Sequence, residues 1–536
     1  MYACPNCNAG LKYDIASGML GCEYCNTKYD PYEMDGPQTA VENDTLEVTV
    51  FSCSQCGGEL YTTDTTVAGF CSFCGSTTVL NSRIEKTLRP DYIIPFQKTK
   101  EDCKNAYAKM MCFAIFAPKE LKNKDCIDSF RGIYMPYWMY DVRYADRVEI
   151  QGVQERMVDE YKVESFYRLS GDLDAGYKGI SYDGSSSFSD NISEKIAPFD
   201  VKHMKEFTPA FLSGFYGDTA DVASEVYKKD ALQSAENMTV NYLKKHEKFK
   251  EFEIRDKESV RRELNPSSQD VHRAMLPVWF MSYRNHDRIA YATVNGQTGK
   301  VVVDLPVDIR KYLFGTLLLA IPIFVLMNMF FTVTPSVLLV LVSLFSVGIA
   351  ALHTLEMKEI MERDNYQDDR GMLYSLEEDE DNEKDDKNAS EGEGENIKQK
   401  KKVPIAVWIF GAILFYIFVL PFVGDFVKNM QVEWLLCLPL VAMLVGAVIA
   451  VVKSVSFMKK TELKNKVPAN LFCLAAIIMA FVIVLLRPIH DWCYYLGTIL
   501  SMGAVLVTLI DLIRKYNVLS TRKLPQFDYK GGDDNA

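Results

Sequence analysis

The sequence has little histidine and none of the common active-site motifs. Its six histidines show neither the spacing of a metal site nor that of a catalytic triad. The chain also lacks a phosphate-binding glycine loop and a Gly-x-Ser-x-Gly turn. We therefore predict that the protein is not an enzyme, although an enzyme of an unfamiliar type stays open as an alternative. The histidines are His203, His246, His272, His286, His353 and His490.

Positive charge is also scarce, with 59 Lys and Arg against 71 Asp and Glu and a net charge of -12. Nucleic-acid binding needs a basic surface that displaces counterions, so nucleic acid is not the expected partner. The opening residues, MYACPNCNAG, lack the basic start and the apolar run of a signal peptide. We expect the first 310 residues to stay in the cytosol, where they are made.

Cysteine is abundant, and its spacing predicts metal. Eight of the 14 cysteines form four Cys-x-x-Cys pairs, in two units whose starts are 49 residues apart (53 minus 4). Within each unit, 14 residues separate the two pairs. Four thiolates on two tight turns are the tetrahedral ligands that zinc prefers, which predicts two closed, structural Zn²⁺ sites; a redox dithiol is the alternative. The predicted ligands are Cys4, Cys7, Cys22, Cys25, Cys53, Cys56, Cys71 and Cys74.

Each of these predicted zinc ribbons is small. A unit of about 25 residues buries too little apolar surface to fold alone. Metal binding, on the order of 10–16 kcal/mol in zinc-finger peptides, would supply the missing stability. Glycines beside the cysteine pairs suit turns with positive φ. These glycines are Gly21, Gly57, Gly58 and Gly75.

The segment 83–310 predicts an α+β body that is rich in strands. Thr99 and Asp102 form a capping-box pattern that opens a helix through Cys112, and Asp218 is the expected cap of a second helix, 219–245. The run 288–307 predicts a hairpin around Asn295-Gly296.

Two aromatic phrases in the body resemble each other. GIYMPYWMYDVRY covers 132–144 and AMLPVWFMSYR covers 274–284, each with Pro-x-Trp. They predict two related strands, with a chance repetition of Pro-x-Trp as the alternative. Their aromatic residues are interpreted as core rather than as a ligand cage. We also expect Cys103, Cys112 and Cys126 to be buried apolar residues, and GSSSFSDN at 184–191 to be a loose loop.

Long apolar runs in the last third of the chain predict a membrane region. The run 312–331 is uncharged and long enough to cross a hydrocarbon core of about 30 Å as a helix. A buried helix of a soluble domain is the alternative, but further runs follow. About six membrane-spanning helices are predicted, at 312–331, 336–352, 404–423, 434–452, 469–486 and 493–513.

The positions of basic residues predict the orientation. The connection 453–467 carries five lysines, and the last span leads into Arg514 and Lys515. The loops on the other side hold little more than Lys428 and Arg487. By the positive-inside rule, both termini face the cytosol and the protein is a multi-pass protein of the inner (cytoplasmic) membrane.

The expected spans carry no charge in their middles, since Asp425, Glu433, His490 and Asp491 are placed at span ends. A charge at mid-span costs about 2.5–3.5 kcal/mol, and transporters usually carry such groups. The spans are therefore interpreted as an anchor rather than as a transporter or channel.

An acidic run, 377–395, holds eleven acids against two lysines. It predicts a disordered segment, either a solvated linker or a partner-binding region, and it is followed by the basic run 398–402, which suits an anionic membrane lipid surface.

The predicted multidomain organisation is zinc ribbon 1 at 1–29, a linker at 30–49, zinc ribbon 2 at 50–82, the body at 83–310, a transmembrane hairpin at 311–353, the acidic cytosolic loop at 354–403, four transmembrane helices at 404–514 and a cytosolic tail at 515–536.

Several phrases make the chain resemble a bacterial family, the TFIIB-type zinc-ribbon-containing membrane proteins. The matching phrases lie between about residues 50 and 310, in the order in which the family has them. They are CSQCGGEL, FCSFCGSTTVL, DYIIPFQKTKEDC, FRGIYMPYWMYD, YDGSSSFSDNISEKIAPFD, FTPAFLSGFYGD, MLPVWFMSYR and VNGQTGKVVVDLPVD.

The resemblance implies a non-enzymatic inner-membrane factor of a membrane-stress system. Such factors work with SPFH-domain (flotillin-like) and PspA-type proteins, so the ribbons would recruit or hold a protein partner, in a homo- or hetero-oligomer, at the cytosolic face. This chain departs from the family by a second ribbon at its start, the acidic loop and four later spans. The hypotheses are therefore a membrane-anchored zinc-ribbon scaffold first, then a membrane-tethered nucleic-acid-binding regulator or a transporter with a regulatory head.

Overall fold

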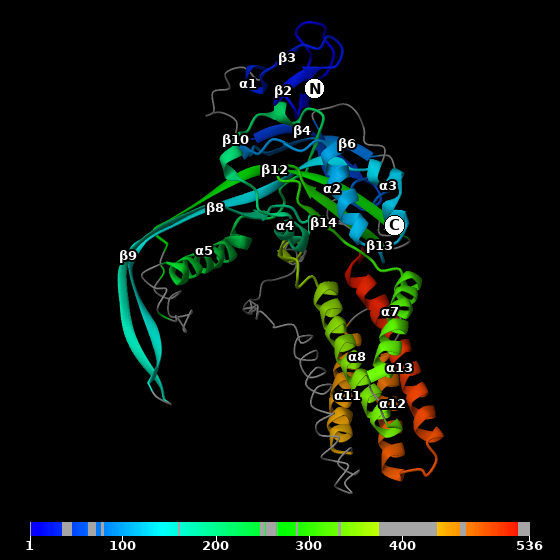
Figure 1. Cartoon of the computed structure of the whole chain (residues 1–536). Coiled ribbons are helices and arrows are strands. Elements are labelled where there is room, and N and C mark those ends of the chain that lie inside the picture. The colour runs from blue at the N-terminus through cyan, green and yellow to red at the C-terminus, as the bar shows by residue number, and fades with distance from the viewer. Residues whose placement is uncertain are drawn as a thin grey trace, which may run out of the picture.

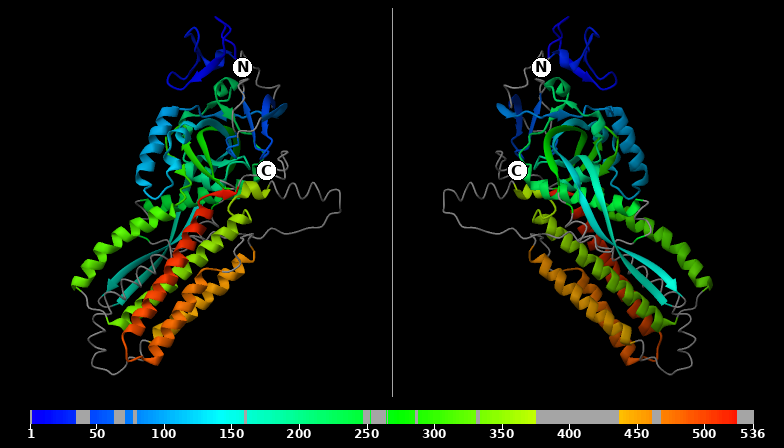
Figure 2. Two further views of the ribbon diagram at one scale, coloured as in Figure 1. Left: turned by 90° about the vertical axis from the view of Figure 1, so that its right-hand side faces the viewer. Right: turned by 90° about the vertical axis from the view of Figure 1, so that its left-hand side faces the viewer.

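A computed structural model shows a small cysteine-rich unit, a large body and a helical bundle, arranged in that order from one end of the molecule to the other (Figure 1). Two side views show the same order, with the body between the unit and the bundle (Figure 2). The structure describes residues 2–34, 45–62, 71–76, 80–158, 161–246, 252, 264, 266–285, 288–330, 334–374, 437–460 and 468–523.

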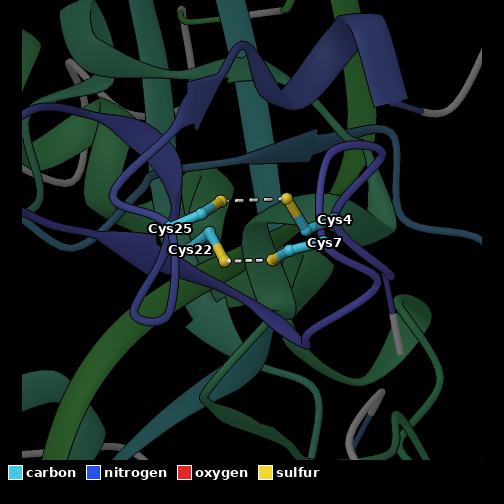
Figure 3. Close-up of side chains that lie close together, drawn as sticks. All are labelled: Cys4, Cys7, Cys22 and Cys25. Atoms are coloured by element: carbon cyan, nitrogen blue, oxygen red, sulfur yellow. Dashed lines mark hydrogen bonds between the residues drawn. The ribbon is translucent and has the colours of Figure 1, made fainter.

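The first cysteine unit is a three-stranded antiparallel sheet of its own, in the order β1-β2-β3. Its two Cys-x-x-Cys turns face each other across this sheet (Figure 3). A short helix, α1, follows within the segment expected to be a linker. The elements are β1 (Leu11–Asp14), β2 (Met19–Cys22), β3 (Lys28–Tyr29) and α1 (Pro31–Met34).

Among the described residues, the body forms one 12-stranded sheet along the path β10-β7-β12-β8-β11-β5-β4-β6, with β13 on β12, β14 and β15 on β13, and β9 on β8. Most pairs are antiparallel, but β7 with β12 and β11 with β8 are parallel. The strands are β4 (Thr45–Cys53), β5 (Glu59–Thr62), β6 (Leu80–Leu88), β7 (Tyr92–Ile93), β8 (Arg131–Val158), β9 (Tyr161–Asp183), β10 (Lys205–Glu206), β11 (Tyr216–Gly217), β12 (Ser268–Asn285), β13 (Arg288–Asn295), β14 (Val301–Val303) and β15 (Arg522–Lys523).

The second cysteine unit belongs to this sheet rather than to a domain of its own. Strand β4 starts at Thr45, inside the expected linker, and pairs with β6 as far as Leu88, beyond the expected boundary at 82. Strand β5 continues the sheet by pairing with β11 of the body. The unit extends further than predicted because each of its strands finds a partner.

The two Pro-x-Trp phrases lie next to each other as central strands. Strands β8 and β12 run antiparallel, with Pro136 opposite Met275 and Pro277 opposite Tyr134. Both tryptophans have the same role: the Trp138 indole N–H donates to the Val222 carbonyl at 2.8 Å and the Trp279 N–H to the Lys98 carbonyl at 2.9 Å. The resemblance of the phrases thus corresponds to two paired strands, each of which ties a neighbouring loop to the sheet.

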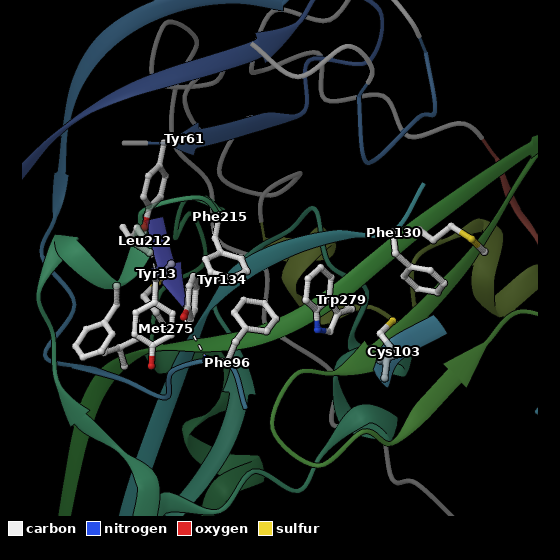
Figure 4. Packing of buried hydrophobic residues seen from close by; sticks show 14 of the residues in the cluster. Tyr13, Tyr61, Phe96, Cys103, Phe130, Tyr134, Leu212, Phe215, Met275 and Trp279 are labelled. Atoms are coloured by element: carbon white, nitrogen blue, oxygen red, sulfur yellow. Dashed lines mark hydrogen bonds between the residues drawn. The ribbon is translucent and has the colours of Figure 1, made fainter. Parts of the chain in front are cut away.

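The larger core cluster of the body is dominated by stacked aromatic rings (Figure 4). Phe96 lies parallel to Phe215 with ring centroids 4.5 Å apart, and both pack against Trp279. Gly132 leaves room for this stack, because a Cβ at this position would lie 2.5 Å from the Phe215 ring. The aromatic phrase of β8 therefore contributes core, as expected.

We expect Gly132→Ala to destabilise the body by about 1–3 kcal/mol, the usual cost of overpacking a core. The methyl group can be accommodated only if the Phe215 ring leaves its stack on Phe96. Urea unfolding of the detergent-solubilised protein measures this change. The matched control is Gly171→Ala on β9, where a Cβ would meet nothing within 4 Å. Equal stability of the two variants would contradict the role given to Gly132.

Helices flank the sheet. Helix α2 (Lys100–Phe113) begins with the predicted capping box, in which Thr99 Oγ1 accepts from the Asp102 N–H and Asp102 accepts from the Thr99 N–H. The short α3 (Lys124–Asp128) and α4 (Asp190–Ile196) follow, and then the longer α5 (Glu225–Lys245).

Helix α5 starts six residues later than predicted, and Asp218 is not its cap. The Asp218 carboxylate instead accepts from the Ser185 hydroxyl at 2.5 Å, and the Asp221 and Val222 N–H groups donate to the Gly184 carbonyl. The residues before Glu225 are thus held by the segment 184–191. This segment is also not a loose loop, because Ser185 and Ser186 are buried and their hydroxyls donate to the carboxylates of Asp218 and Asp221.

Four described helices are long and apolar enough to cross a membrane: α7 (Ile309–Phe330), α8 (Pro335–Asp364), α11 (Cys437–Met458) and α13 (Trp492–Leu519). A shorter apolar helix, α12 (Asn470–Leu486), packs with α8, α11 and α13. They correspond to five of the six predicted spans, and α8 is longer than predicted. The sixth, 404–423, and the acidic run 377–395 lie outside the described residues.

The bundle is joined to the body where the first helix begins and the last one ends. The Asn517 amide on α13 exchanges two hydrogen bonds with the Val307 backbone, just before α7. The Arg288 guanidinium of β13 donates to the carbonyls of Val518 and Thr521 and so caps the end of α13. Strand β15 then pairs with β13, so the chain returns to the body sheet after the bundle.

Candidate metal centres

The first four cysteines converge on one point, as predicted. Cys4 Sγ lies 3.5 Å from Cys25 Sγ, and Cys7 Sγ lies 3.4 Å from Cys22 Sγ (Figure 3). All four sulfur atoms lie within 4.8 Å of one another. A tetrahedral site with Zn–S bonds of about 2.3 Å places its sulfur atoms about 3.8 Å apart. The group has the donors and the spacing to hold one metal ion.

The second four cysteines make an equivalent group. Cys53 Sγ lies 3.8 Å from Cys74 Sγ, and Cys56 Sγ lies 3.7 Å from Cys71 Sγ. Again the four sulfur atoms lie within 4.8 Å of one another. The two groups are the only candidate metal clusters among the residues that the structure describes. Each has four cysteines and no weaker ligand, which is typical of a structural site.

The four Cys-x-x-Cys turns share one backbone conformation. In each turn, the residue four positions after the first cysteine has a positive φ of 55–73° and donates its N–H to the carbonyl of that cysteine. The second unit uses glycine there, as predicted, whereas the first uses asparagine, the other residue that tolerates this region. Gly21 and Gly58 are not at positive φ. The four residues are Asn8, Asn26, Gly57 and Gly75.

The first centre lies at the surface. Cys7 and Cys25 are half-buried, and the neighbouring Tyr24 is 82% exposed. The Thr27 hydroxyl lies 3.0 Å from Cys25 Sγ, and this contact is the largest of the effects that lower the pKa of Cys25 to about 6. A thiol that ionises near neutral pH is suited to binding a metal cation.

Few contacts hold the first unit to the body. Tyr13 of β1 and Tyr32 of α1 both pack edge-on against Phe211. The Tyr13 N–H donates to the Ser213 carbonyl, and the Tyr32 hydroxyl donates to the Glu206 carbonyl. The unit thus sits on the body through the patch around Phe211, with Cys7 and Cys25 partly exposed and Cys4 and Cys22 buried.

The second centre is buried in the body. All four of its cysteines are buried, and they belong to a core cluster that also contains Phe280 and Tyr291. Phe73, between Cys71 and Cys74, packs edge-on against Phe280, and its carbonyl accepts from the Tyr291 hydroxyl at 2.8 Å. The second centre therefore lies inside the structure that it stabilises.

The other cysteines of the body differ from the prediction in one case. Cys103 is buried, and burial raises the pKa of its thiol; Cys126 is half-buried, and burial raises its pKa to about 11. Both fit the expectation of inert apolar residues. Cys112, in contrast, is exposed, because the face of α2 that carries it points away from the sheet.

The described helices bring together an ionisable pair that the sequence analysis did not single out. Asp511 lies within α13, eight residues before its end, and its carboxylate is 2.9 Å from Nε2 of His353 on α8. The His353 side chain is fully buried. Asp511 could have been noticed, since it lies inside the predicted span 493–513, but nothing in the sequence indicated that His353 would meet it.

Comparison with known proteins places the chain beside one curated protein. No protein-family model and no solved structure matches it. The chain is 27% identical over 319 residues to "Uncharacterized protein YdjG" of Bacillus subtilis (strain 168), a match that covers 58% of this chain and 91% of that protein. The name of this relative states no activity. The resemblance to zinc-ribbon membrane proteins therefore stays a prediction.

Proposed function

We propose that the protein is a membrane-anchored scaffold, in which two zinc ribbons shape a head that holds a protein partner beside the membrane. The observation that carries this proposal is the difference between the two cysteine centres. One is buried in the body, and the other lies at the surface, at the end of the molecule opposite the bundle (Figure 1). A scaffold needs both a stable head and an accessible docking unit.

The chemistry of the two centres favours zinc and a structural role. Four thiolates without an open position suit Zn²⁺, which has no redox chemistry of its own. In the proposed topology, the head and both termini lie in the cytosol and the bundle crosses the cytoplasmic membrane. The reducing cytosol would keep the eight cysteines available for metal.

The proposed partner is a protein. The first unit presents a metal-stabilised turn with Tyr24, an aromatic residue of the kind that anchors protein interfaces. The resemblance described above makes an SPFH-domain or PspA-type protein the leading candidate, in a response to membrane stress. The alternative of a nucleic-acid-binding regulator is not favoured, because the net charge is -12.

Site-specific photo-crosslinking in living cells tests the proposal. A photoreactive phenylalanine analogue replaces Tyr24 in the full chain, and the matched control places it at Phe113 on α2, which is also 82% exposed. We expect a discrete adduct from position 24, identified by mass spectrometry as an SPFH-domain or PspA-type protein, and none from position 113.

A second variant tests the dependence on metal. Cys4→Ser with Cys7→Ser removes two ligands of the first centre and should reduce the Tyr24 adduct at least tenfold while the amount of protein in the membrane stays the same. Equal adducts from both positions, or an adduct that survives the loss of the two cysteines, would contradict docking at the first ribbon.

A further inference from the structure

The ionisable groups buried in the bundle lie in its half next to the body, whereas the buried polar groups of the other half are hydroxyls, such as those of Ser343 and Ser346. The half away from the body is filled by a cluster that includes Leu339 and Val340 of α8, Met443 of α11 and Ile477 of α12. The half next to the body contains His353, Asp511 and the network around Thr354 instead. The hydroxyl and amide groups can hold the helices together by hydrogen bonds, as an anchor requires, but a buried ionisable pair is costly in a membrane and points to a function.

The His353–Asp511 pair is the centre of the polar half. Taking the Asp511 carboxylate out of water costs several kcal/mol, and the hydrogen bond from His353 offsets part of this cost. Nε2 of His353 bonds to Asp511, while Nδ1 is buried and has no hydrogen-bond partner among the described residues. The open Nδ1 is therefore a vacant proton-binding position in the tautomer that donates from Nε2.

Other buried atoms near the pair also lack partners. Within the described residues, Glu356 Oε2 and Asn470 Oδ1 are buried without a hydrogen bond. Unpaired polar groups in a bundle are usually satisfied by water. Water bound at these atoms would satisfy them and link the pair to the body side.

The charged groups around the pair lead towards the body. Glu356 lies one helical turn after His353 on α8, and Lys515 lies one turn after Asp511 on α13, with Arg514 beside it. From the other two helices, the described polar groups near the pair are neutral: Ser454 on α11, and Asn470 and Cys473 on α12. On the opposite side, the apolar cluster fills the space between the described helices.

We propose that His353 and Asp511 form a proton-binding site that exchanges protons with the body side of the membrane and is closed to the far side. A proton taken up at Nδ1 converts the neutral imidazole into imidazolium, and the Asp511 carboxylate at 2.9 Å compensates the new positive charge. Release of that proton restores the neutral ring, so the step balances without another reactant. The inference requires that the bundle crosses a membrane, but it does not depend on what the ribbons bind.

Infrared difference spectroscopy of the full chain tests the site. The protein is reconstituted in liposomes in one orientation, and the buffer pH is changed on one side at a time. The steps run between about pH 5 and 8, and we expect imidazole and carboxylate bands that change with them. The change should follow a pH step on the body side and be at least tenfold slower after a step on the far side.

Variants assign the bands. His353→Gln should abolish the imidazole band that responds to the pH step on the body side. Asp511→Asn should remove the carboxylate band that changes together with it and shift the pH midpoint of the imidazole band. The matched controls are His490→Gln and Asp491→Asn, which change the same residue types in the exposed turn before α13. These controls should leave the coupled bands unchanged.

Two results would overturn the proposal. The first is that every band of the wild-type protein that changes over this pH range is still present in both variants, or that no band changes at all. The second is a fast response to the far side. The sidedness measurement uses only the wild-type chain, so it decides the question even if a variant does not fold. Partner crosslinking from position 24 is a separate readout, so failure of this site and failure of the scaffold are distinguishable.

Discussion

Replacing Cys71 by serine is expected to unfold the body of the protein, whereas replacing Cys25 by serine should unfold only the first ribbon. Each change removes one thiolate and should lower the bound metal from two ions to one. The second centre lies in the core cluster with Phe280 and Tyr291, so its loss opens the main sheet. Metal binding is worth on the order of 10 kcal/mol, which equals or exceeds the stability of most domains.

The two variants are compared by metal content and limited proteolysis of the detergent-solubilised protein. Cleavage within β12 and β13 should increase at least tenfold in Cys71→Ser and stay at the wild-type level in Cys25→Ser. In the latter, cleavage should be confined to the first unit, which contacts the body mainly at Phe211. Equal protection of the body in both variants would show that the second centre is not needed for the fold.

The second large effect concerns pH and the segment that follows α8. Asp369 lies beside Asp190, whose carboxylate accepts from the Tyr227 hydroxyl at 2.6 Å and from the Arg370 N–H at 2.8 Å. Burial, and then repulsion from Asp190, raise the pKa of Asp369 from 3.8 to about 7. We expect the body to become less stable as the pH rises from 4 to 7 in this region.

The sign follows from proton binding. An acid whose pKa is higher in the folded state binds more protons folded than unfolded, so its contribution to stability is complete below pH 3.8 and is lost as the pH rises through about 7. Asp369→Asn removes this loss but keeps the Oδ1 atom that accepts from the Met372 N–H. A change of 1 kcal/mol in the free energy of unfolding shifts the melting temperature by about 2–4 °C. The variant should therefore melt several degrees higher than wild type at pH 8, and the gain should be smaller at pH 5.

Thermal unfolding in detergent, followed at both pH values, measures the difference. Asp172→Asn on β9 is the matched control, since this carboxylate is exposed and should change the melting temperature by less than about 1 °C. A gain for Asp369→Asn that is the same at pH 5 and pH 8 would mean that the carboxylate does not carry the pH dependence.

The features that the sequence predicts well depend on residues close together in the chain. Eight cysteines at fixed spacing indicate both metal centres, because two tight turns bring four thiolates together whatever surrounds them. The capping box at Thr99 and the hairpin at Asn295-Gly296 are local in the same way, and both are present. Long apolar runs likewise indicate helices without knowledge of their neighbours.

The features that the sequence does not reveal depend on distant partners. Asp218 could not be known to bond to Ser185 rather than cap a helix, since the two are 33 residues apart. His353 and Asp511 are separated by 158 residues, and each alone is an ordinary residue near the end of a predicted span. The difference between the two cysteine centres is of the same kind, because the spacing is identical and only the surrounding sheet differs.

The return of β15 to the body sheet has a consequence for biosynthesis. Arg288 can bond to Thr521 only after the 233 residues that separate them have been synthesised. The whole bundle is therefore translated before this edge of the sheet can close. Until the last helix is inserted, the edge of β13 that faces away from β12 lacks the pairing of Arg288 and Ile289 with β15. Maturation of the head is thus tied to successful insertion, and a chain that stalls in the translocation machinery would display an unfinished edge to proteases.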